Sequence, residues 1–186
     1  MREITGDLFS HNRHGPDAIC ITTNGYVGKD GCNVMGMGSA GEAKKRYPGI
    51  EKRLGVLLEN EGNQVHLLTQ IADGQIHLAG IYAPYHIVSF PTKPRVVNES
   101  DELLPRYRKA HEGHLEDLNL PGWMSQSRID LIYQSAVELQ KLATEREWKS
   151  IVLPRPGCGA GGLEWTDVKP VLENVLDDRF YVITKG

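Results

Sequence analysis

Hydrophobic runs and amphipathic stretches alternate along most of this chain. The run 17–23 is short, β-branched and apolar, which is the pattern of a buried strand. Similar patterns recur later, bounded by glycine, proline and other turn residues. The segments with this strand pattern are 17–23, 65–71, 76–81, 85–90, 150–153 and 180–184. Strands are therefore expected from the first tenth of the chain to its end.

Helical patterns lie between these strands. Residues 43–47 and 50–58 have helical spacing of apolar positions and are separated by the turn Pro48-Gly49. Ser127 and Asp130 form a capping-box signature ahead of a long amphipathic stretch, and a last helix precedes the final strand. The apolar faces of these two helices are Ile129, Ile132, Ala136, Leu139 and Ala143, and Val168, Leu172 and Val175. This alternation predicts one α/β domain spanning 1–186.

The stretch 91–122 breaks the alternation. It is rich in charged residues, contains four prolines and shows only weak helical spacing between 102 and 118. We expect an insertion over 94–122 that acts as a lid. His111 and His114 lie within it, but they lack a third convergent ligand and the HExxH spacing. We interpret them as solvated helix surface rather than as a metal site.

Composition and charge narrow the classes of function. The 21 basic and 24 acidic residues give a net charge of −3 with no long run of either sign, so no uniformly basic face is expected. Cys20, Cys32 and Cys158 form no CxxC pair, which argues against a disulfide framework and fits a reducing cytoplasm. No apolar run is long enough to cross a bilayer, and the first ten residues lack an apolar signal segment. We therefore expect a cytoplasmic protein without a membrane segment.

Two glycine-rich loops each follow a predicted strand. The first contains Gly36-Met37-Gly38, and the second is 156–162. Ligands of open α/β sheets collect at the carboxyl ends of strands, where glycine lets backbone N–H groups approach phosphate oxygens. Together the loops would clamp a diphosphate. Ordinary tight turns are the alternative interpretation, because neither loop matches a complete nucleotide-binding fingerprint.

The order of these segments resembles the macro domain family. The matching segments are 6–9, 17–19, Asn24, 33–38 and 153–165. The resemblance implies a three-layer α/β/α fold with a mixed, mostly parallel central sheet, and a site for ADP-ribose. Neither a cofactor nor a metal is expected.

The resemblance also implies a role for each site residue. Asp17 would accept a hydrogen bond from the adenine amine, the two loops would hold the diphosphate, and Asn24 and Asn33 would reach the distal ribose. The expected ligand-binding residues are Asp17, Ala18, Met35, Gly36, Met37, Gly38, Pro156, Gly157, Cys158, Gly159, Ala160, Gly161 and Gly162. Alternatives stay open, since Asp17 also suits a strand end, Asn24 a turn before Gly25, and Asn33 an ordinary loop.

Lys93 is the third expected catalytic residue, with Asn24 and Asn33. The motif Ser89-Phe90-Pro91-Thr92-Lys93 is similar to the branch of the family that contains DarG-type antitoxins and related phage and bacterial proteins, which remove ADP-ribose from DNA bases. Lys93 would act as a nucleophile or stabilise a leaving group; the alternative is a surface lysine that ends a strand. Gly161 stands where related glycohydrolases have an aspartate paired with the lysine, so a lysine–aspartate mechanism is not expected. Cys32 and Cys158 are assigned no catalysis, because no histidine accompanies either one.

These observations lead to one leading hypothesis and two alternatives. The leading one is a monomeric ADP-ribosyl hydrolase that removes ADP-ribose from a modified macromolecule, either DNA or protein. The alternatives are a non-catalytic module that binds ADP-ribose and a phosphatase acting on ADP-ribose 1″-phosphate. Lys93 favours an enzyme, whereas the adjacent insertion and Gly161 weaken that preference.

Overall fold

A computed structural model of the chain describes residues 1–10, 15–108 and 119–186. The strands are β1 (Arg2–Thr5), β2 (Ala18–Asn24), β3 (His66–Leu67), β4 (Gln70–Ala72), β5 (Gln75–Leu78), β6 (Ile81–Tyr82), β7 (His86–Lys93), β8 (Ile151–Pro154) and β9 (Phe180–Thr184). The helices are α1 (Gly38–Arg46), α2 (Ile50–Glu61), α3 (Pro105–Arg108), α4 (Ile129–Glu145) and α5 (Trp165–Glu173), with a short 3₁₀ helix, η2 (Gly122–Met124).

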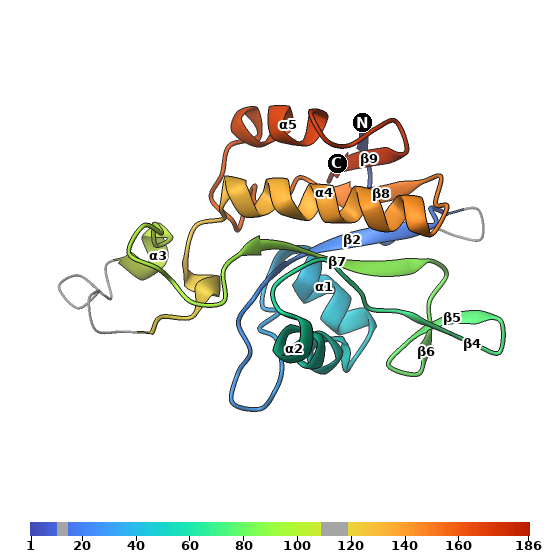
Figure 1. Ribbon diagram of the computed structural model, residues 1–186, viewed down its shortest axis with the longest axis horizontal. Coiled ribbons are helices and arrows are strands. Elements are labelled where there is room, and N and C mark those ends of the chain that lie inside the picture. The colour runs from blue at the N-terminus through green and yellow to red at the C-terminus, as the bar shows by residue number, and fades with distance from the viewer. Residues whose placement is uncertain (11–14, 109–118) are drawn as a thin grey trace.

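Six strands form the central sheet, in the order β1-β9-β8-β2-β7-β3. All neighbours pair in parallel except β3, which pairs antiparallel with β7. Figure 1 shows α4 and α5 on one face of this sheet and α1 and α2 on the other. The prediction of a three-layer α/β/α fold with a mixed, mostly parallel sheet is confirmed.

The two faces of the sheet each cover a hydrophobic core. Along β2, Ile19 and Ile21 belong to the cluster beneath α1 and α2, while Ala18 and Cys20 belong to the cluster beneath α4 and α5. Successive side chains of a strand point to opposite faces, so a strand buried on both sides is apolar throughout. This is why 17–23 reads as a continuous apolar run rather than an alternating one.

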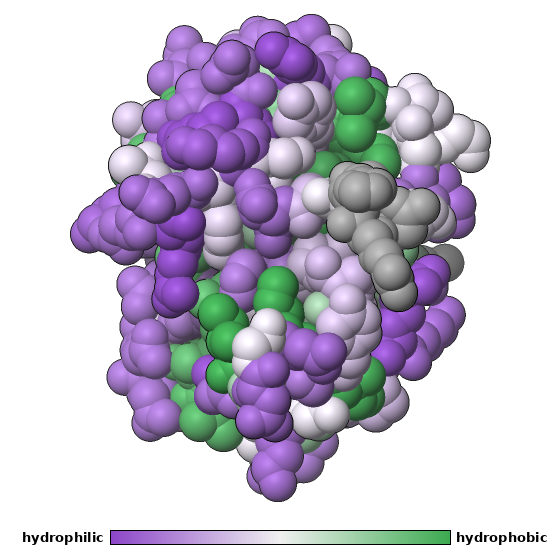
Figure 2. Space-filling view, turned by 90° about the vertical axis from the view of Figure 1, so that its right-hand side faces the viewer, coloured by the Kyte–Doolittle hydropathy of each residue, from purple (hydrophilic) through white to green (hydrophobic). Residues whose placement is uncertain are grey.

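The segment 65–71 differs from its prediction as one strand. Its first part is β3 in the central sheet, and its last part is β4 in a separate three-stranded antiparallel sheet, β4-β5-β6. The chain bends between them at Leu68 and Thr69, which are both buried against β7, with Leu68 N donating to Ile87 O at 2.9 Å. Figure 2 faces this side of the molecule and shows a mainly hydrophilic surface, with hydrophobic residues in its lower half. Ile71 and Ile81 of the small sheet are exposed.

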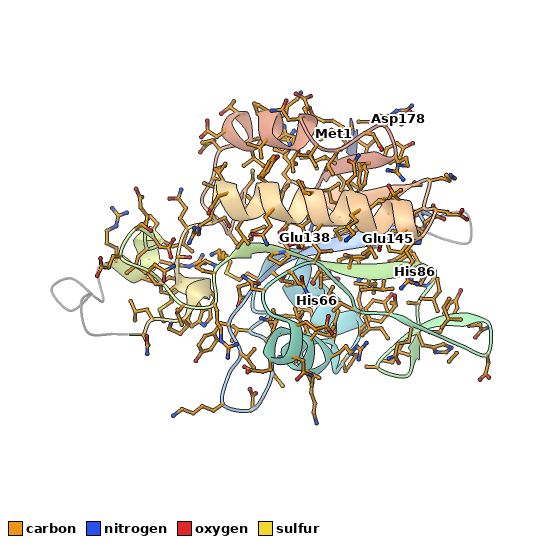
Figure 3. All side chains as sticks on the ribbon, viewed as in Figure 1. Met1, His66, His86, Glu138, Glu145 and Asp178 are labelled. Atoms are coloured by element: carbon orange, nitrogen blue, oxygen red, sulfur yellow. The ribbon has the colours of Figure 1, made fainter. Side chains whose placement is uncertain are left out.

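The start of α4 also differs from its prediction. Arg128, not Ser127, is the N-cap residue, and no side chain caps the helix. Asp130, the expected capping-box partner, instead pairs with Arg128 at 2.6 Å. Further along α4, Glu138, labelled in Figure 3, accepts a hydrogen bond from Val65 N at 2.8 Å and so ties the helix to the strand region below it. Ser127 thus does not cap α4, although its spacing from Asp130 predicts that role.

The described parts of the segment 94–122 pack against the carboxyl ends of the central strands. Val96 forms an antiparallel bridge with Pro121, which brings the two ends of the segment together. Leu103, Leu104 and Leu120 are buried. Figure 1 shows α3, which belongs to this segment, beyond the end of β7. The part of the weakly helical stretch 102–118 that begins at residue 109 lies outside the described residues.

Within 1–10, 15–108 and 119–186, no helix has the length and apolar character that a membrane crossing requires.

Candidate functional site

A cavity of about 330 Å³ lies at the carboxyl ends of β8, β2 and β7. These adjacent parallel strands end at Pro154, Asn24 and Lys93, so the loops that follow them meet at one edge. The residues lining the cavity are Thr22, Thr23, Asn24, Val34, Gly36, Met37, Gly38, Ser39, Ala40, Thr92, Lys93, Arg106, Tyr107, Trp123, Ser127, Pro154, Arg155, Gly157, Cys158, Ala160 and Gly161. The two glycine loops are thus brought together, as we expected from their positions after strands.

The first loop reaches the cavity through Gly36, Met37 and Gly38. Gly38 has a φ of +61° and begins α1, so the amino end of a nine-residue helix faces the cavity. Ser39 fixes this end to the sheet, because its Oγ accepts a hydrogen bond from Thr22 N at 3.0 Å. Backbone N–H groups at a helix amino terminus form an anion site. Met35, also expected to bind ligand, is instead buried in the core.

The second loop lines the cavity with Gly157, Cys158, Ala160 and Gly161. Gly157 has a φ of +76°, and a Cβ there would come within 2.8 Å of Ile132 Cδ1, so only glycine fits. Pro156, Gly159 and Gly162 belong to the same loop but do not line the cavity.

Lys93 is the buried cation of the site. The residue is only 9% exposed, and its Nζ donates to Trp123 O at 3.2 Å and to Ala160 O at 3.4 Å. Burial, and then the charge of Arg106, lower the pKa of Lys93 to about 8. Lys93 is therefore not an ordinary surface lysine. Near pH 8, a substantial fraction of the protein molecules carries Lys93 as the neutral amine.

The two asparagines have different positions. Asn24 lines the cavity, with its Nδ2 donating to Val34 O at 2.8 Å and its Oδ1 accepting from Tyr26 N at 3.0 Å. Asn33 is 2% exposed, does not line the cavity, and donates from Nδ2 to the carbonyls of Asn24 and Tyr26, both at 2.8 Å. Asn33 thus holds the end of β2 that carries Asn24, rather than lining the cavity itself.

The structure places Asp17 and Ala18 away from the cavity, contrary to the adenine-binding role expected for them. Asp17 precedes β2, whereas the cavity lies at the carboxyl end of this strand. Its Oδ2 accepts hydrogen bonds from Lys149 N at 2.6 Å and Ser150 N at 3.0 Å, so it holds the turn that leads into β8. Ala18 is fully buried inside the sheet.

Sequence reasoning missed several residues at this edge. Arg106 and Tyr107 line the cavity from α3, with the Arg106 guanidinium 4.9 Å from the Tyr107 ring centroid and the rings of Tyr107 and Trp123 5.3 Å apart, edge to face. The weak periodicity of 94–122 contains no signal for them. Asp7, which was not among the expected ligand residues, is exposed and follows β1, whose carboxyl end lies at the same edge of the sheet as the cavity.

The described cysteines and histidines do not suggest other chemistry. Burial raises the pKa of both Cys32 and Cys158, so neither thiol is activated as a nucleophile. In the described part of the chain, no three His, Cys, Asp or Glu side chains are grouped for a metal ion. His111 and His114 lie outside the described residues.

Comparison with known proteins assigns the fold. No protein-family model matches the chain. The chain is 24% identical over 154 residues to proteins named DNA ADP-ribosyl glycohydrolase from Mycobacterium tuberculosis and Mycobacterium bovis, matching 82% of this chain and 35% of each relative. It therefore spans about a third of the length of the curated relatives it matches.

Solved structures agree over the whole chain. The macrodomain of Mycobacterium tuberculosis DarG matches with a TM-score of 0.64 at 21% identity, covering 100% of this chain and 97% of that one. The macrodomain of Thermus aquaticus DarG matches with a TM-score of 0.60 at 22% identity over the same shares. Thermosipho africanus DarTG in complex with ADP-ribose matches with a TM-score of 0.63 at 19% identity, covering 100% of this chain and 42% of that one. The resemblance expected from the sequence is confirmed for the fold.

Proposed function

This chain has the macrodomain fold, and from that premise we propose that it binds ADP-ribose and hydrolyses the bond between ADP-ribose and a modified macromolecule. The observation that carries this proposal is the position of Lys93, a buried lysine with a lowered pKa between two glycine loops. Such a combination of cavity, backbone donors and perturbed titratable group is typical of active sites.

The loops would hold the diphosphate of ADP-ribose. The amino end of α1 at Gly38 and the second loop at Gly157 and Gly161 line the same cavity, and glycine at these positions lets a ligand approach the backbone N–H groups. With the diphosphate there, the distal ribose lies toward Lys93 on β7, and the adenosine extends along the sheet edge toward β9 and β1. Asp7, at the end of β1, then replaces Asp17 as the carboxylate proposed to meet the adenine amine.

Lys93 would act as the nucleophile. Its neutral amine would attack the anomeric carbon of the distal ribose, the bond to the macromolecule would break, and a proton of the amine would pass to the leaving group. Water would then add its hydroxyl to the anomeric carbon and its proton to the amine, which releases ADP-ribose and restores Lys93. A lysine–aspartate pair of the kind found in related glycohydrolases does not fit, because a Cβ at Gly161 would collide with Gly157 O and Ser127 Oγ. Asn24, with both polar atoms engaged by the loop, would orient the ribose through the loop backbone.

The wall beside Lys93 supports a nucleic-acid substrate. Arg106, Tyr107 and Trp123 present a cation and two aromatic rings to the cavity, and such groups stack on nucleobases. The curated relatives are named for activity on DNA. We therefore favour ADP-ribosylated DNA over ADP-ribosylated protein, with 94–122 selecting the attached group. Tyr107→Ala should lower kcat/KM on such DNA about tenfold, with the affinity for free ADP-ribose unchanged.

The proposal includes the setting of the protein. A bacterial or phage protein working as a monomer in a reducing cytoplasm is consistent with the three free cysteines Cys20, Cys32 and Cys158.

A non-catalytic module that binds ADP-ribose is the alternative function. The two carbonyl contacts that hold Lys93 Nζ favour this alternative.

One experiment separates these functions. Wild type and Lys93→Ala are incubated with ADP-ribosylated DNA, ADP-ribosylated protein and ADP-ribose 1″-phosphate, and the released ADP-ribose is measured by chromatography. We expect release from DNA by the wild type only. Equal inactivity of both proteins, together with calorimetric binding of ADP-ribose, would identify a binding module. Turnover of the 1″-phosphate alone would identify a phosphatase.

A further inference from the structure

Ser127 has a buried hydroxyl at the cavity. The residue is 5% exposed, lines the cavity, and its Oγ has no hydrogen-bond partner among the described residues. Its backbone is fixed, because Ser127 N donates to Gly161 O at 2.8 Å. The hydroxyl does not cap α4, whose N-cap is Arg128. A buried hydroxyl without a partner is costly, so the group is expected to meet one when the cavity is filled.

Neighbouring hydroxyls show that this condition is specific to Ser127. Ser125, two residues earlier, donates to Gly122 O at 2.8 Å, and Ser135 donates to Pro91 O at 2.8 Å. Ser39, also on the cavity wall, accepts from Thr22 N at 3.0 Å. These three serines around the site are thus bonded within the protein, whereas the hydroxyl of Ser127, a residue that lines the cavity, has no hydrogen-bond partner among the described residues.

The hydroxyl lies next to the proposed reacting centre. It occupies the volume into which a side chain at Gly161 would extend, since a Cβ there would collide with Ser127 Oγ. Ala160, the residue before Gly161, accepts a hydrogen bond from Lys93 Nζ at 3.4 Å. Near Gly161 the cavity is therefore lined by a neutral serine from just before α4, and none of its described lining residues carries a carboxylate.

We propose that Ser127 Oγ is a ligand-binding group that hydrogen-bonds a hydroxyl of the distal ribose and holds that ribose against Lys93. This inference rests on the proposed binding of ADP-ribose. A serine hydroxyl both donates and accepts, which suits a sugar hydroxyl, whereas the phosphates have the N–H groups of the two glycine loops. Ser127 takes no proton and forms no covalent bond in this scheme. Its role is to position the sugar through a hydrogen bond.

The test compares Ser127→Ala with the matched control Ser125→Ala, using calorimetry with two probes. ADP-ribose carries the distal ribose and ADP lacks it. Ser127→Ala should weaken ADP-ribose binding about three- to tenfold, the range for one hydrogen bond, and leave ADP binding unchanged. Ser125→Ala should leave both affinities unchanged. Its melting temperature should fall, because it loses a bonded hydroxyl, whereas that of Ser127→Ala should stay the same or rise.

The outcomes separate this inference from the proposed function. If the folded wild type binds ADP-ribose and Ser127→Ala binds it within twofold, the assignment of Ser127 is wrong while the proposed function stands. Equal weakening of ADP and ADP-ribose would also overturn the assignment, because the effect would not be confined to the distal ribose. If the wild type binds neither probe, the proposed function and the inference fail together.

Discussion

The pH dependence of turnover is the most direct test of Lys93 as a nucleophile. Both causes of its lowered pKa, burial and Arg106, disfavour the ammonium form. A lysine that acted by stabilising negative charge would gain nothing from either cause, whereas a nucleophile requires the neutral amine. We therefore expect kcat/KM on ADP-ribosylated DNA to rise with pH, with a midpoint near 8.

The magnitude follows from the pKa. Lowering it from 10.5 to about 8 raises the neutral fraction at pH 7 from roughly 0.03% to about 10%, an increase of about 300-fold. Lys93→Ala should lower kcat by at least two orders of magnitude with little change in ADP-ribose affinity. Lys93→Arg should be equally inactive, because a guanidinium stays protonated.

A substitution at Arg106 tests the pKa of Lys93 independently. Arg106→Met removes the second cause of the shift, so the pKa of Lys93 should move back toward its usual value and the midpoint of the rate profile to higher pH. Arg108→Met is the matched control, since Arg108 lies on the same short helix and pairs with Glu102 at 3.5 Å. A rate that falls as pH passes 8, or activity retained by Lys93→Arg, would refute the nucleophile assignment.

The same pKa predicts a change in stability. The pKa of Lys93 is lower in the folded than in the unfolded protein, so between pH 8 and 10.5 the unfolded state binds the extra proton and stability rises with pH. Relative to Lys93→Met, the wild type should gain up to about 3 kcal/mol of unfolding free energy over this window. Denaturant titrations at several pH values measure the difference, and a flat difference would mean that the pKa is not lowered.

Three further variants test the binding loops. Gly36 lines the cavity, its backbone φ lies outside the left-handed region, and the space around its Cβ position is open. Gly36→Ala, Gly36→Val and Gly36→Leu should therefore weaken ADP-ribose binding increasingly from Ala to Leu, with little change in melting temperature. Asn33→Ala removes the donor to two carbonyls and should cost about 2 kcal/mol of stability by denaturant titration. Asp17→Ala should lower stability by about 1 kcal/mol and leave calorimetric ADP-ribose affinity intact, whereas Asp7→Ala should weaken it; the reverse result would restore the adenine-binding role to Asp17.

Local patterns in the sequence were enough to predict the class of fold and the edge that carries the site. Runs such as 17–23 and 180–184 predict buried strands because a strand covered on both faces has few polar positions. Glycine loops after two such strands predict a shared edge because parallel strands end on the same side of a sheet. Lys93 was identified differently, from the resemblance of the motif 89–93 to one branch of the macro domain family.

Several features depended on how the strands, loops and helix starts pack in three dimensions. Asp17 precedes β2 and Asn24 ends it, but a strand of this length holds its two ends about 20 Å apart, so only one of them reaches the cavity. Ser127 has the spacing of a capping residue, yet packing against Gly161 sets where its helix begins. Contacts across large sequence separations leave no periodic trace in the chain.

Amino-acid order alone predicted most of the central strands, the main helices and both glycine loops, because these depend on neighbours a few positions away. Tertiary structure decided which side chains share a cavity. Arg106 and Tyr107 come from a segment with no clear pattern, and they share a cavity with Lys93 only because the described parts of 94–122 lie at the end of β7. The burial that lowers the pKa of Lys93 has the same origin, since desolvation depends on everything packed around the amine rather than on its neighbours in sequence.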